Sequence, residues 1–389
     1  MERDSVLQIT AITRVMPEGQ KCVAATIRYE FPPAMDQPLE GRFQVEGRKI
    51  LSAHVQGNQV VLELDPQDPG ADTYFPGNPW QAMPARIEPA QVTVTQCCPI
   101  QGANHQLLPA FGPRENNAVE NELVDDFIQG EEDGVKYNLF IPRNIQPQER
   151  YPLVQFIHDG SVCGPDPRLT LAQGLGAVIW TAPEEQKRHP CFVFAPQFDG
   201  ESIVDDEGNV SPRLEVAKKI LDRILEQYPV DRDRVYTTGQ SMGCMASIVW
   251  NVRYPQYFAA SFLVAGQWNE RSIPGLENQH LWMLNSQGDA KSFPGMNQMC
   301  VAMEHKGGKV VHRVVDAGLS QEEYNQMVED LVKTGANVLC THYRLETVAD
   351  GWHSNGGEHH VHTWRTAYSI QAIRDWLFTI RKGADCERN

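Results

Sequence analysis

The chain has 389 residues, which is long enough for two domains, and its 41% hydrophobic and 22% charged residues are typical of a globular protein. A formal net charge of −16 argues against nucleic acid or an anionic membrane surface as a partner. No apolar run approaches membrane-spanning length, so we expect no membrane association.

The N-terminal stretch MERDSVLQIT carries charge where a signal peptide would be apolar. As given, the chain is therefore expected to be cytoplasmic; it would be secreted if a leader had been removed. Its nine cysteines are odd in number and include no C-x-x-C pair. This distribution predicts neither a disulfide framework nor a zinc site.

Residues 1–112 predict a small all-β domain. Short runs of strand-forming residues are separated by turn clusters such as Pro17-Glu18-Gly19 and Gly57-Asn58. This spacing indicates an immunoglobulin-like β-sandwich, followed by a polar linker at 113–123. The domain shows no catalytic motif, so we expect a spacer or a dock, with a ligand-binding module as the alternative. The expected strands are at 6–12, 22–29, 41–45, 50–55, 59–64 and 90–94.

Residues 124–389 alternate strand and helix patterns, which predicts an α/β domain with a doubly wound, mostly parallel sheet. Ser211-Pro212 is a helix cap followed by proline at the first helical position. The expected strands are at 135–142, 151–158, 191–196, 235–238, 260–265, 281–284, 309–315 and 337–343. The expected helices are at 212–227, 294–305, 321–333 and 364–381.

The motif Gly239-Gln240-Ser241-Met242-Gly243 lies between a strand pattern and a helix pattern. G-x-S-x-G in that context is typical of a nucleophile elbow, a strained turn that exposes a reactive serine. A side chain at either glycine would collide with the adjoining backbone. Ser241 is therefore the candidate nucleophile, and the Met242 N–H at the helix start is a candidate oxyanion donor.

The other parts of a hydrolytic triad follow from chain order, in which the acid comes after the serine and the histidine comes last. Asp289 follows the strand at 281–284 at the sheet edge where catalytic groups gather, so it is the candidate acid. The base is expected from a loop before the last helix, which carries four histidines: His353, His359, His360 and His362. A metal cluster of these histidines is an alternative, but only Glu358 adds a further ligand nearby.

His158-Asp159-Gly160-Ser161 ends an apolar strand, at the place where such enzymes carry H-G-x-G. The Gly160 N–H is therefore the second candidate oxyanion donor. Trp268 emerges at the same sheet edge after the strand at 260–265 and is the candidate substrate-binding residue, with loop packing as the alternative. Trp352, within the histidine segment, is a second aromatic of this kind.

Residues 124–384 resemble the bacterial α/β-hydrolase esterases related to polyhydroxybutyrate depolymerases and to feruloyl and acetylxylan esterases. The resemblance is carried by YPLVQFIHDG, VYTTGQSMG and HVHTWRTAYSIQAIRDWLF. The preceding domain resembles the immunoglobulin-like domain of some of these enzymes. Relatives place the histidine three or four residues before the aromatic that opens the last helix, which implies His360. Asp159 replaces their usual glycine, and we expect its carboxylate to point away from the oxyanion.

The sequence thus predicts a serine carboxylic-ester hydrolase with the triad Ser241, His360 and Asp289, acting on a small-molecule or polymer-borne ester and needing no metal or organic cofactor. The same triad would serve a peptidase or an acyltransferase. A non-catalytic module that binds carbohydrate or protein is the third alternative.

Overall fold

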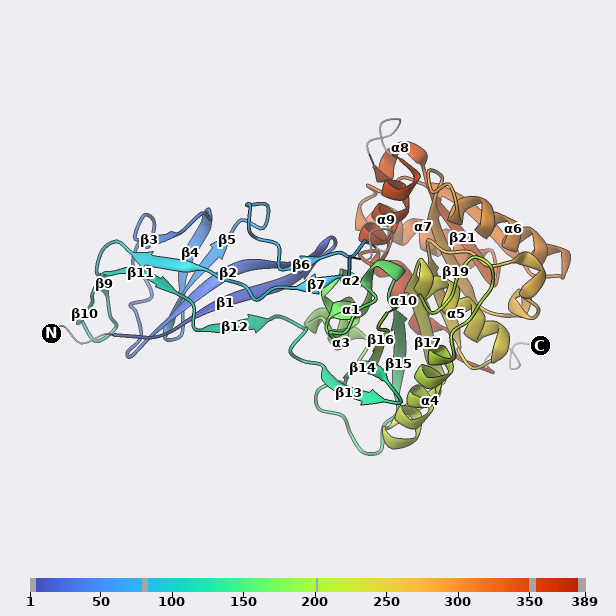
Figure 1. Cartoon of the computed structure of the whole chain (residues 1–389), viewed down its shortest axis with the longest axis horizontal. Coiled ribbons are helices and arrows are strands. Elements are labelled where there is room, and N and C mark those ends of the chain that lie inside the picture. Colours follow the sequence, from blue (N-terminus) through green and yellow to red (C-terminus); the bar gives the residue numbers. More distant parts are fainter. Residues whose placement is uncertain (1–4, 79–82, 201, 350–354, 384–389) are drawn as a thin grey trace. The chain divides into compact units, whose positions relative to one another are not determined.

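The computed structural model describes residues 5–78, 83–200, 202–349 and 355–383, and the chain divides into two compact units (Figure 1). The first, which we call the β unit, comprises Met1–Phe75 and Arg86–Asp126. The second, which we call the α/β unit, comprises Pro76–Ala85 and Phe127–Asn389. A ten-residue piece from the middle of the N-terminal sequence thus belongs to the C-terminal unit.

The β unit is a sandwich of a five-stranded sheet, ordered β12-β1-β2-β5-β4, and a three-stranded sheet, ordered β11-β8-β3. Its core lies between the sheets, and the buried Tyr29 hydroxyl donates to Gln96 Oε1 over 2.7 Å to link them. The strands are β1 (Val6–Met16), β2 (Gly19–Tyr29), β3 (Phe43–Val45), β4 (Ile50–Gln56), β5 (Gln59–Leu64), β6 (Tyr74–Phe75), β7 (Arg86–Ile87), β8 (Thr93–Gln96), β9 (Ile100–Gln101), β10 (Leu107–Leu108), β11 (Phe111–Glu115) and β12 (Ala118–Asn121).

The segment 113–123, expected to be a linker, differs from that expectation. Most of it is in β11, which pairs with β8, and in β12, which pairs in parallel with β1. Asn117 adds to this attachment, because its side-chain oxygen accepts the Ile9 N–H over 3.1 Å. These strands escape prediction because their side chains are mostly exposed and show no apolar alternation.

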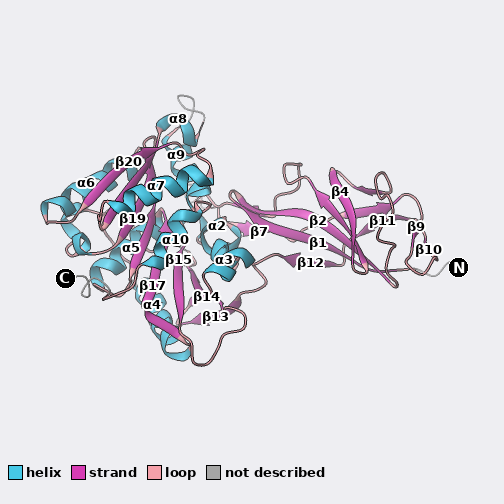
Figure 2. Ribbon diagram, turned by 180° about the vertical axis from the view of Figure 1, so that it is seen from behind, coloured by secondary structure: helices cyan, strands magenta, loops and turns pink. Residues whose placement is uncertain are grey.

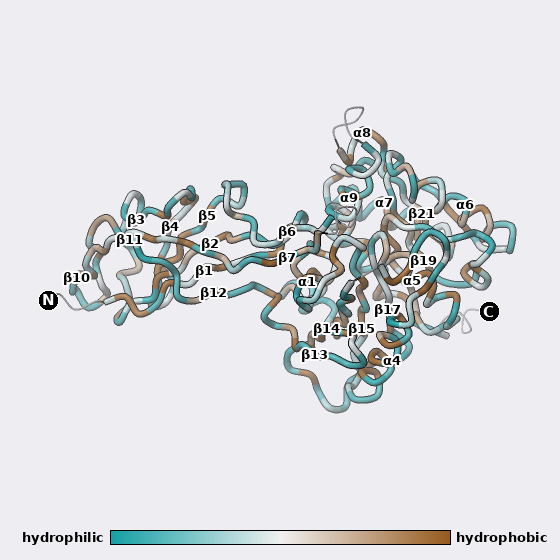
Figure 3. The backbone as a smooth tube through the Cα atoms, viewed as in Figure 1, coloured by the Kyte–Doolittle hydropathy of each residue, from teal (hydrophilic) through white to brown (hydrophobic). Residues whose placement is uncertain are grey.

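The α/β unit is built on one nine-stranded sheet in the order β13-β14-β16-β15-β17-β18-β19-β21-β20. The β13–β14 and β14–β16 pairs are antiparallel and all the others are parallel. Strands β15, β18 and β19, in the middle of the sheet, are buried along their whole length and are mostly hydrophobic (Figure 3). The strands are β13 (Ile128–Glu132), β14 (Val135–Phe140), β15 (Tyr151–Ile157), β16 (Phe192–Gln197), β17 (Val230–Gln240), β18 (Ala260–Val264), β19 (Leu281–Ser286), β20 (Val310–Val315) and β21 (Val338–Tyr343).

Helices cover both faces of this sheet (Figures 1 and 2). α4, α5 and α6 pack on one face through two clusters of buried apolar side chains. On the other face, Tyr368 packs against Phe156 and Phe262, and Trp376 of α10 packs against Trp282. The helices are α1 (Leu169–Ala172), α2 (Leu175–Val178), α3 (Pro183–Arg188), α4 (Pro212–Gln227), α5 (Met242–Arg253), α6 (Ser292–His305), α7 (Gln321–Lys333), α8 (Leu345–Val348), α9 (Gly356–Ala367) and α10 (Gln371–Thr379).

The predicted fold class is therefore confirmed: a β-sandwich followed by a mostly parallel, doubly wound sheet. One difference bears on the site. The sequence predicts a single closing helix over 364–381, whereas the structure has α9 and α10 with a break at 368–370. Among the described residues, none of the helices combines the length and the apolar character that crossing a membrane requires.

Candidate active site

Ser241 occupies the turn between β17 and α5, with the strained backbone angles φ 52° and ψ −118°. Both neighbouring glycines are required by space, as the sequence predicts. A Cβ on Gly239 would lie 2.5 Å from the Gly243 carbonyl carbon, and one on Gly243 would overlap the Ile157 carbonyl oxygen. The bare backbone lets α5 approach the end of β15, and this approach holds the serine at the edge of the sheet.

A continuous chain of hydrogen bonds joins Ser241, His360 and Asp289. His360 Nε2 lies 2.9 Å from Ser241 Oγ, and His360 Nδ1 lies 2.5 Å from Asp289 Oδ2. A carboxylate can only accept, so Nδ1 carries the proton and Nε2 is free to accept the serine hydroxyl proton. The His360 ring also packs edge-to-face on Trp364, one helical turn further along, with 5.0 Å between ring centroids.

The three described histidines of the candidate segment lie on helix α9, not on a loop as expected. Asn355 caps this helix by accepting the Gly357 and Glu358 N–H groups. His360 is the one that reaches Ser241. His359 is buried, with Nδ1 3.4 Å from Ser286 Oγ, and His362 Nδ1 lies 3.2 Å from the Val348 carbonyl. His353 and Trp352 fall outside the described residues.

Asp289 is 2% exposed and is held by the first turn of α6. Its Oδ1 accepts the Ser292 N–H over 2.9 Å and the Lys291 N–H over 3.1 Å, while Ser292 Oγ donates to Oδ2. Burial alone would raise the pKa of this carboxyl, but the hydrogen bonds from His360 and Ser292 outweigh burial and lower its pKa. Asp289 therefore stays ionised beside the imidazole.

The two candidate oxyanion donors are neighbours. A Cβ placed on Gly160 would lie 4.0 Å from Met242 Cβ, its nearest neighbour outside the adjoining residues. Gly160 begins a 3₁₀ turn (Gly160–Val162) and Met242 begins α5, so both N–H groups belong to helix starts, which lack intrahelical acceptors. Within the described parts of the chain, neither N–H has a hydrogen-bond acceptor.

Asp159 links the turn that carries Gly160 to the elbow. Its Oδ1 accepts the Ser161 N–H over 2.9 Å and the Ser161 hydroxyl over 2.5 Å. Its Oδ2 accepts Gln240 Nε2 over 3.0 Å, and Gln240 immediately precedes the serine. Both carboxylate oxygens are thus engaged, which accounts for an acid at a position where the resemblance implies glycine. Sequence reasoning missed this link, because 81 residues separate Asp159 from Gln240.

The same turn is held from two further sides. The Gly77 N–H, from the inserted piece 76–85, donates to the Ser161 carbonyl over 3.1 Å. His158 is fully buried; its Nδ1 lies 2.8 Å from the Asp159 carbonyl, and its Nε2 accepts the Phe198 N–H over 3.1 Å. Burial lowers the pKa of His158, so its imidazole is neutral at neutral pH.

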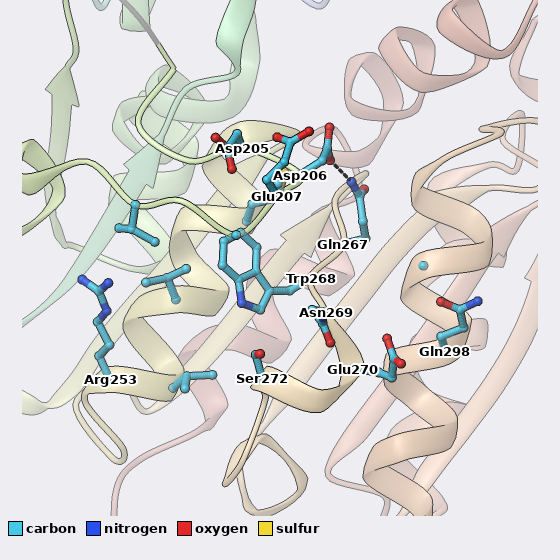
Figure 4. Close-up of a pocket in the computed structure, with 16 residues that line it drawn as sticks. Asp205, Asp206, Glu207, Arg253, Gln267, Trp268, Asn269, Glu270, Ser272 and Gln298 are labelled. Carbon is cyan, nitrogen blue, oxygen red and sulfur yellow. Dashed lines mark hydrogen bonds between the residues drawn. The ribbon is translucent and has the colours of Figure 1, made fainter.

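Trp268 lines a cavity of about 520 Å³ alongside one face of α5 (Figure 4). Ser241, Asp289 and His360 do not line this cavity. Gln267, which lines the cavity, follows Gly266 in the chain, and a Cβ built on Gly266 would lie 3.0 Å from the Ser241 carbonyl oxygen. The opposite wall is acidic and comes from the loop after β16, with Asp205, Asp206 and Glu207. Gln267 Nε2 bridges the two walls by donating to Asp206 over 2.9 Å.

Fold and geometry together define a two-unit protein: an immunoglobulin-like β-sandwich and an α/β-hydrolase fold with a Ser-His-Asp constellation at its elbow. Comparisons agree with this architecture. Residues 8–109 match the family model of the esterase Ig-like N-terminal domain. No curated protein matches the chain.

Among solved structures, a thermostable esterase aligns with 96% of this chain and 100% of its own, at 24% identity and a TM-score of 0.80. The feruloyl esterase module of Clostridium thermocellum aligns with 64% of this chain and 86% of its own, at 14% identity and a TM-score of 0.43. An acetyl xylan esterase from Aspergillus awamori aligns with 46% of this chain and 80% of its own, at 15% identity and a TM-score of 0.34. The likeness to the thermostable esterase over nearly the whole chain confirms the fold that the sequence resemblance implies.

We predict that Asp159→Ala lowers kcat by up to about 100-fold, because the turn that carries Gly160 loses its attachment to Gln240 and one oxyanion donor drifts. Asp166→Ala is the matched control, since Asp166 lies in the same loop but pairs with Arg168. Steady-state kinetics on a simple ester would measure both variants. Equal effects of the two substitutions would show that Asp159 has no positioning role.

A second prediction concerns acid stability. Folding lowers the pKa of His158, so below the unfolded pKa of about 6.5 the unfolded state binds more protons than the folded state. The contribution of neutral His158 to the free energy of unfolding is therefore complete above that pH and is lost as the pH falls below it. Urea unfolding of the wild type and of His158→Gln at several pH values would measure this. We expect the stability difference between the two proteins to shrink on acidification; a constant difference would contradict the assignment.

Proposed function

We propose that the protein is a serine carboxylic-ester hydrolase that works through an acyl-enzyme. The observation that carries this proposal is the hydrogen-bonded chain from Asp289 through His360 to Ser241, beside two backbone N–H groups without acceptors in the described chain. This arrangement places a nucleophile, a base, an orienting acid and a pair of anion-binding N–H groups at one edge of the sheet.

In the proposed reaction, Ser241 Oγ attacks the carbonyl carbon of the ester while His360 Nε2 takes its proton. The oxyanion accepts hydrogen bonds from the Gly160 and Met242 N–H groups, each worth about 3 kcal/mol in comparable enzymes. His360 then gives the proton to the leaving alcohol, which departs as the acyl-enzyme forms. A water molecule, activated by the same Nε2, releases the acid, and Asp289 stabilises the imidazolium in both halves.

The sandwich match supports ester rather than peptide chemistry, since the matched family model describes a domain of esterases. An acyltransferase would use the same acyl-enzyme with an alcohol in place of water. A non-catalytic module would have no use for a strained, hydrogen-bonded serine at a helix start. We accordingly propose a small-molecule or polymer-borne ester as the substrate.

We predict that the wild type hydrolyses p-nitrophenyl acetate but not a peptide anilide, and that Ser241→Ala and His360→Ala each lose about 10⁴-fold or more in kcat. Turnover assays of the purified variants measure this, with circular dichroism as the check on folding. Preferred cleavage of the anilide would favour the peptidase alternative.

The neighbours of His360 on α9 provide matched controls. His362→Ala should retain activity, and His359→Ala should lose stability but keep its turnover per folded molecule, because His359 packs in the interior. Activity that survives in His360→Ala but vanishes in one of these two variants would move the base to that residue.

We further propose that Trp268 binds the bulky part of the substrate. Its indole lines the cavity beside α5, and its backbone N–H donates to Met299 Sδ over 3.2 Å, which fixes its position (Figure 4). The facing acidic wall would disfavour a substrate that carries a carboxylate at this end.

Trp268→Ala should lower kcat/KM more for an aromatic ester than for an acetate ester, by about 1–3 kcal/mol of discrimination, because only the larger group reaches the indole. Trp268→Phe should show a smaller loss. Parallel assays on the two esters, with a melting curve, measure the effect. Equal losses on both substrates together with a lower Tm would assign Trp268 to packing alone.

A further inference from the structure

Beneath helix α6, away from the triad, three potential metal ligands converge from three different elements. Cys300 lies on α6, Cys340 on β21 and His312 on the edge strand β20. The two sulfurs and one His312 ring nitrogen all lie within 4.8 Å of one another. The strand register explains the meeting, because His312 is the direct partner of Cys340 in the parallel β20–β21 pair.

A series of hydrogen bonds determines which ring nitrogen of His312 carries the proton. Asn285 Nδ2 donates to Met296 Sδ over 3.1 Å, which leaves Asn285 Oδ1 to accept from His342 Nδ1 over 2.7 Å. His342 Nε2 then accepts the proton of His312 Nδ1 over 3.0 Å. This order leaves His312 Nε2 unprotonated, with a lone pair available. Metal-bound histidines are typically oriented in this way, by donating their other ring N–H to a neighbour.

From this convergence we propose that Cys300, Cys340 and His312 bind a thiophilic divalent cation of the Zn²⁺ type. On binding, the two thiols release their protons to solvent and two sulfur–metal bonds form, with no change of oxidation state. Two thiolates neutralise the charge of the ion, so the site carries no net charge into the apolar cluster around it. His312 is exposed, which gives the ion a path from solvent and leaves room for water as the fourth ligand.

The two thiols must separate slightly to take the ion. Their sulfurs are 2.7 Å apart, whereas two zinc–sulfur bonds of about 2.3 Å at a tetrahedral angle place the sulfurs roughly 3.8 Å apart. A modest rotation of the Cys300 side chain, which also lies 4.0 Å from Met283 Sδ, would supply that separation. Met283 thus adds a third sulfur beside the two thiols, and thiophilic ions such as Zn²⁺ favour sulfur ligands.

Bound there, the ion would be structural. It would fasten α6 to β20 and β21, and the first turn of α6 holds Asp289. The inference does not depend on the proposed ester chemistry, because its readout is metal binding. The sequence predicts no zinc site because the three ligands are spaced 12 and 28 residues apart along the chain and form no recognised motif.

The experiment uses the full chain with Cys97→Ser and Cys98→Ser as background, because these adjacent exposed thiols could bind metal on their own. Zn²⁺ is titrated calorimetrically, and bound zinc is counted by mass spectrometry after dialysis. We expect one tight Zn²⁺ per chain and a Tm that rises with Zn²⁺. Replacing Zn²⁺ by Co²⁺ should produce thiolate-to-cobalt charge-transfer absorption.

His312→Ala is the decisive variant, because an exposed residue can be removed without disturbing the core. Its zinc affinity should fall by more than about 10–100-fold, the loss typical when a residue that hydrogen-bonds to a metal ligand is removed. His305→Ala, which removes another exposed histidine at the end of α6, should bind as the background protein does. Unchanged zinc binding in His312→Ala would overturn the site. A disulfide between Cys300 and Cys340 would also overturn it. Mass spectrometry would show that disulfide as an intact mass lower by two hydrogens and as a cross-linked peptide that contains both cysteines.

Discussion

The close approach of α5 to the end of β15 is the constraint on which the site depends. It is possible only because Gly239 and Gly243 lack side chains, and it forces Ser241 into a conformation that a non-glycine residue rarely adopts. The cost of that strain is offset by the apolar packing of α5, whose residues are almost all buried. The same turn presents the Ser241 hydroxyl to His360. In the proposed reaction it also directs the Met242 N–H toward the developing oxyanion.

Hydrogen bonds on both sides of this turn hold Gly160, Asp289 and His360 in place. Asp159 connects the turn of Gly160 to Gln240, and the inserted piece 76–85 holds the same turn through Gly77. On the other side, the first turn of α6 fixes Asp289, which in turn orients His360. Each attachment is a hydrogen bond to a buried or half-buried group, so its loss would act on geometry before it acts on the fold.

Sequence reasoning was strongest where the signals are local. The sequence predicts the bounds of α4 and α7 to the residue, because apolar residues recur at helical spacing in both and the Ser211-Pro212 cap marks the start of α4. Ser241 and Asp289 follow from one motif and from chain order, whereas the choice of His360 among four histidines rests on the family resemblance. The sequence does not reveal that α9 begins at Gly356, because two consecutive glycines favour a loop. In the structure the Asn355 cap starts the helix in spite of them. Asp159 and the cluster around Cys340 depend on contacts between distant segments, which no local pattern reveals.

Labelling with a fluorophosphonate probe tests the central claim most directly, because the reagent needs both an activated serine and an oxyanion-binding pair. The account predicts one adduct per chain, located on Ser241 by peptide mapping, that is absent in Ser241→Ala and greatly slowed in His360→Ala. An adduct on another serine, or undiminished labelling of Ser241→Ala, would contradict it.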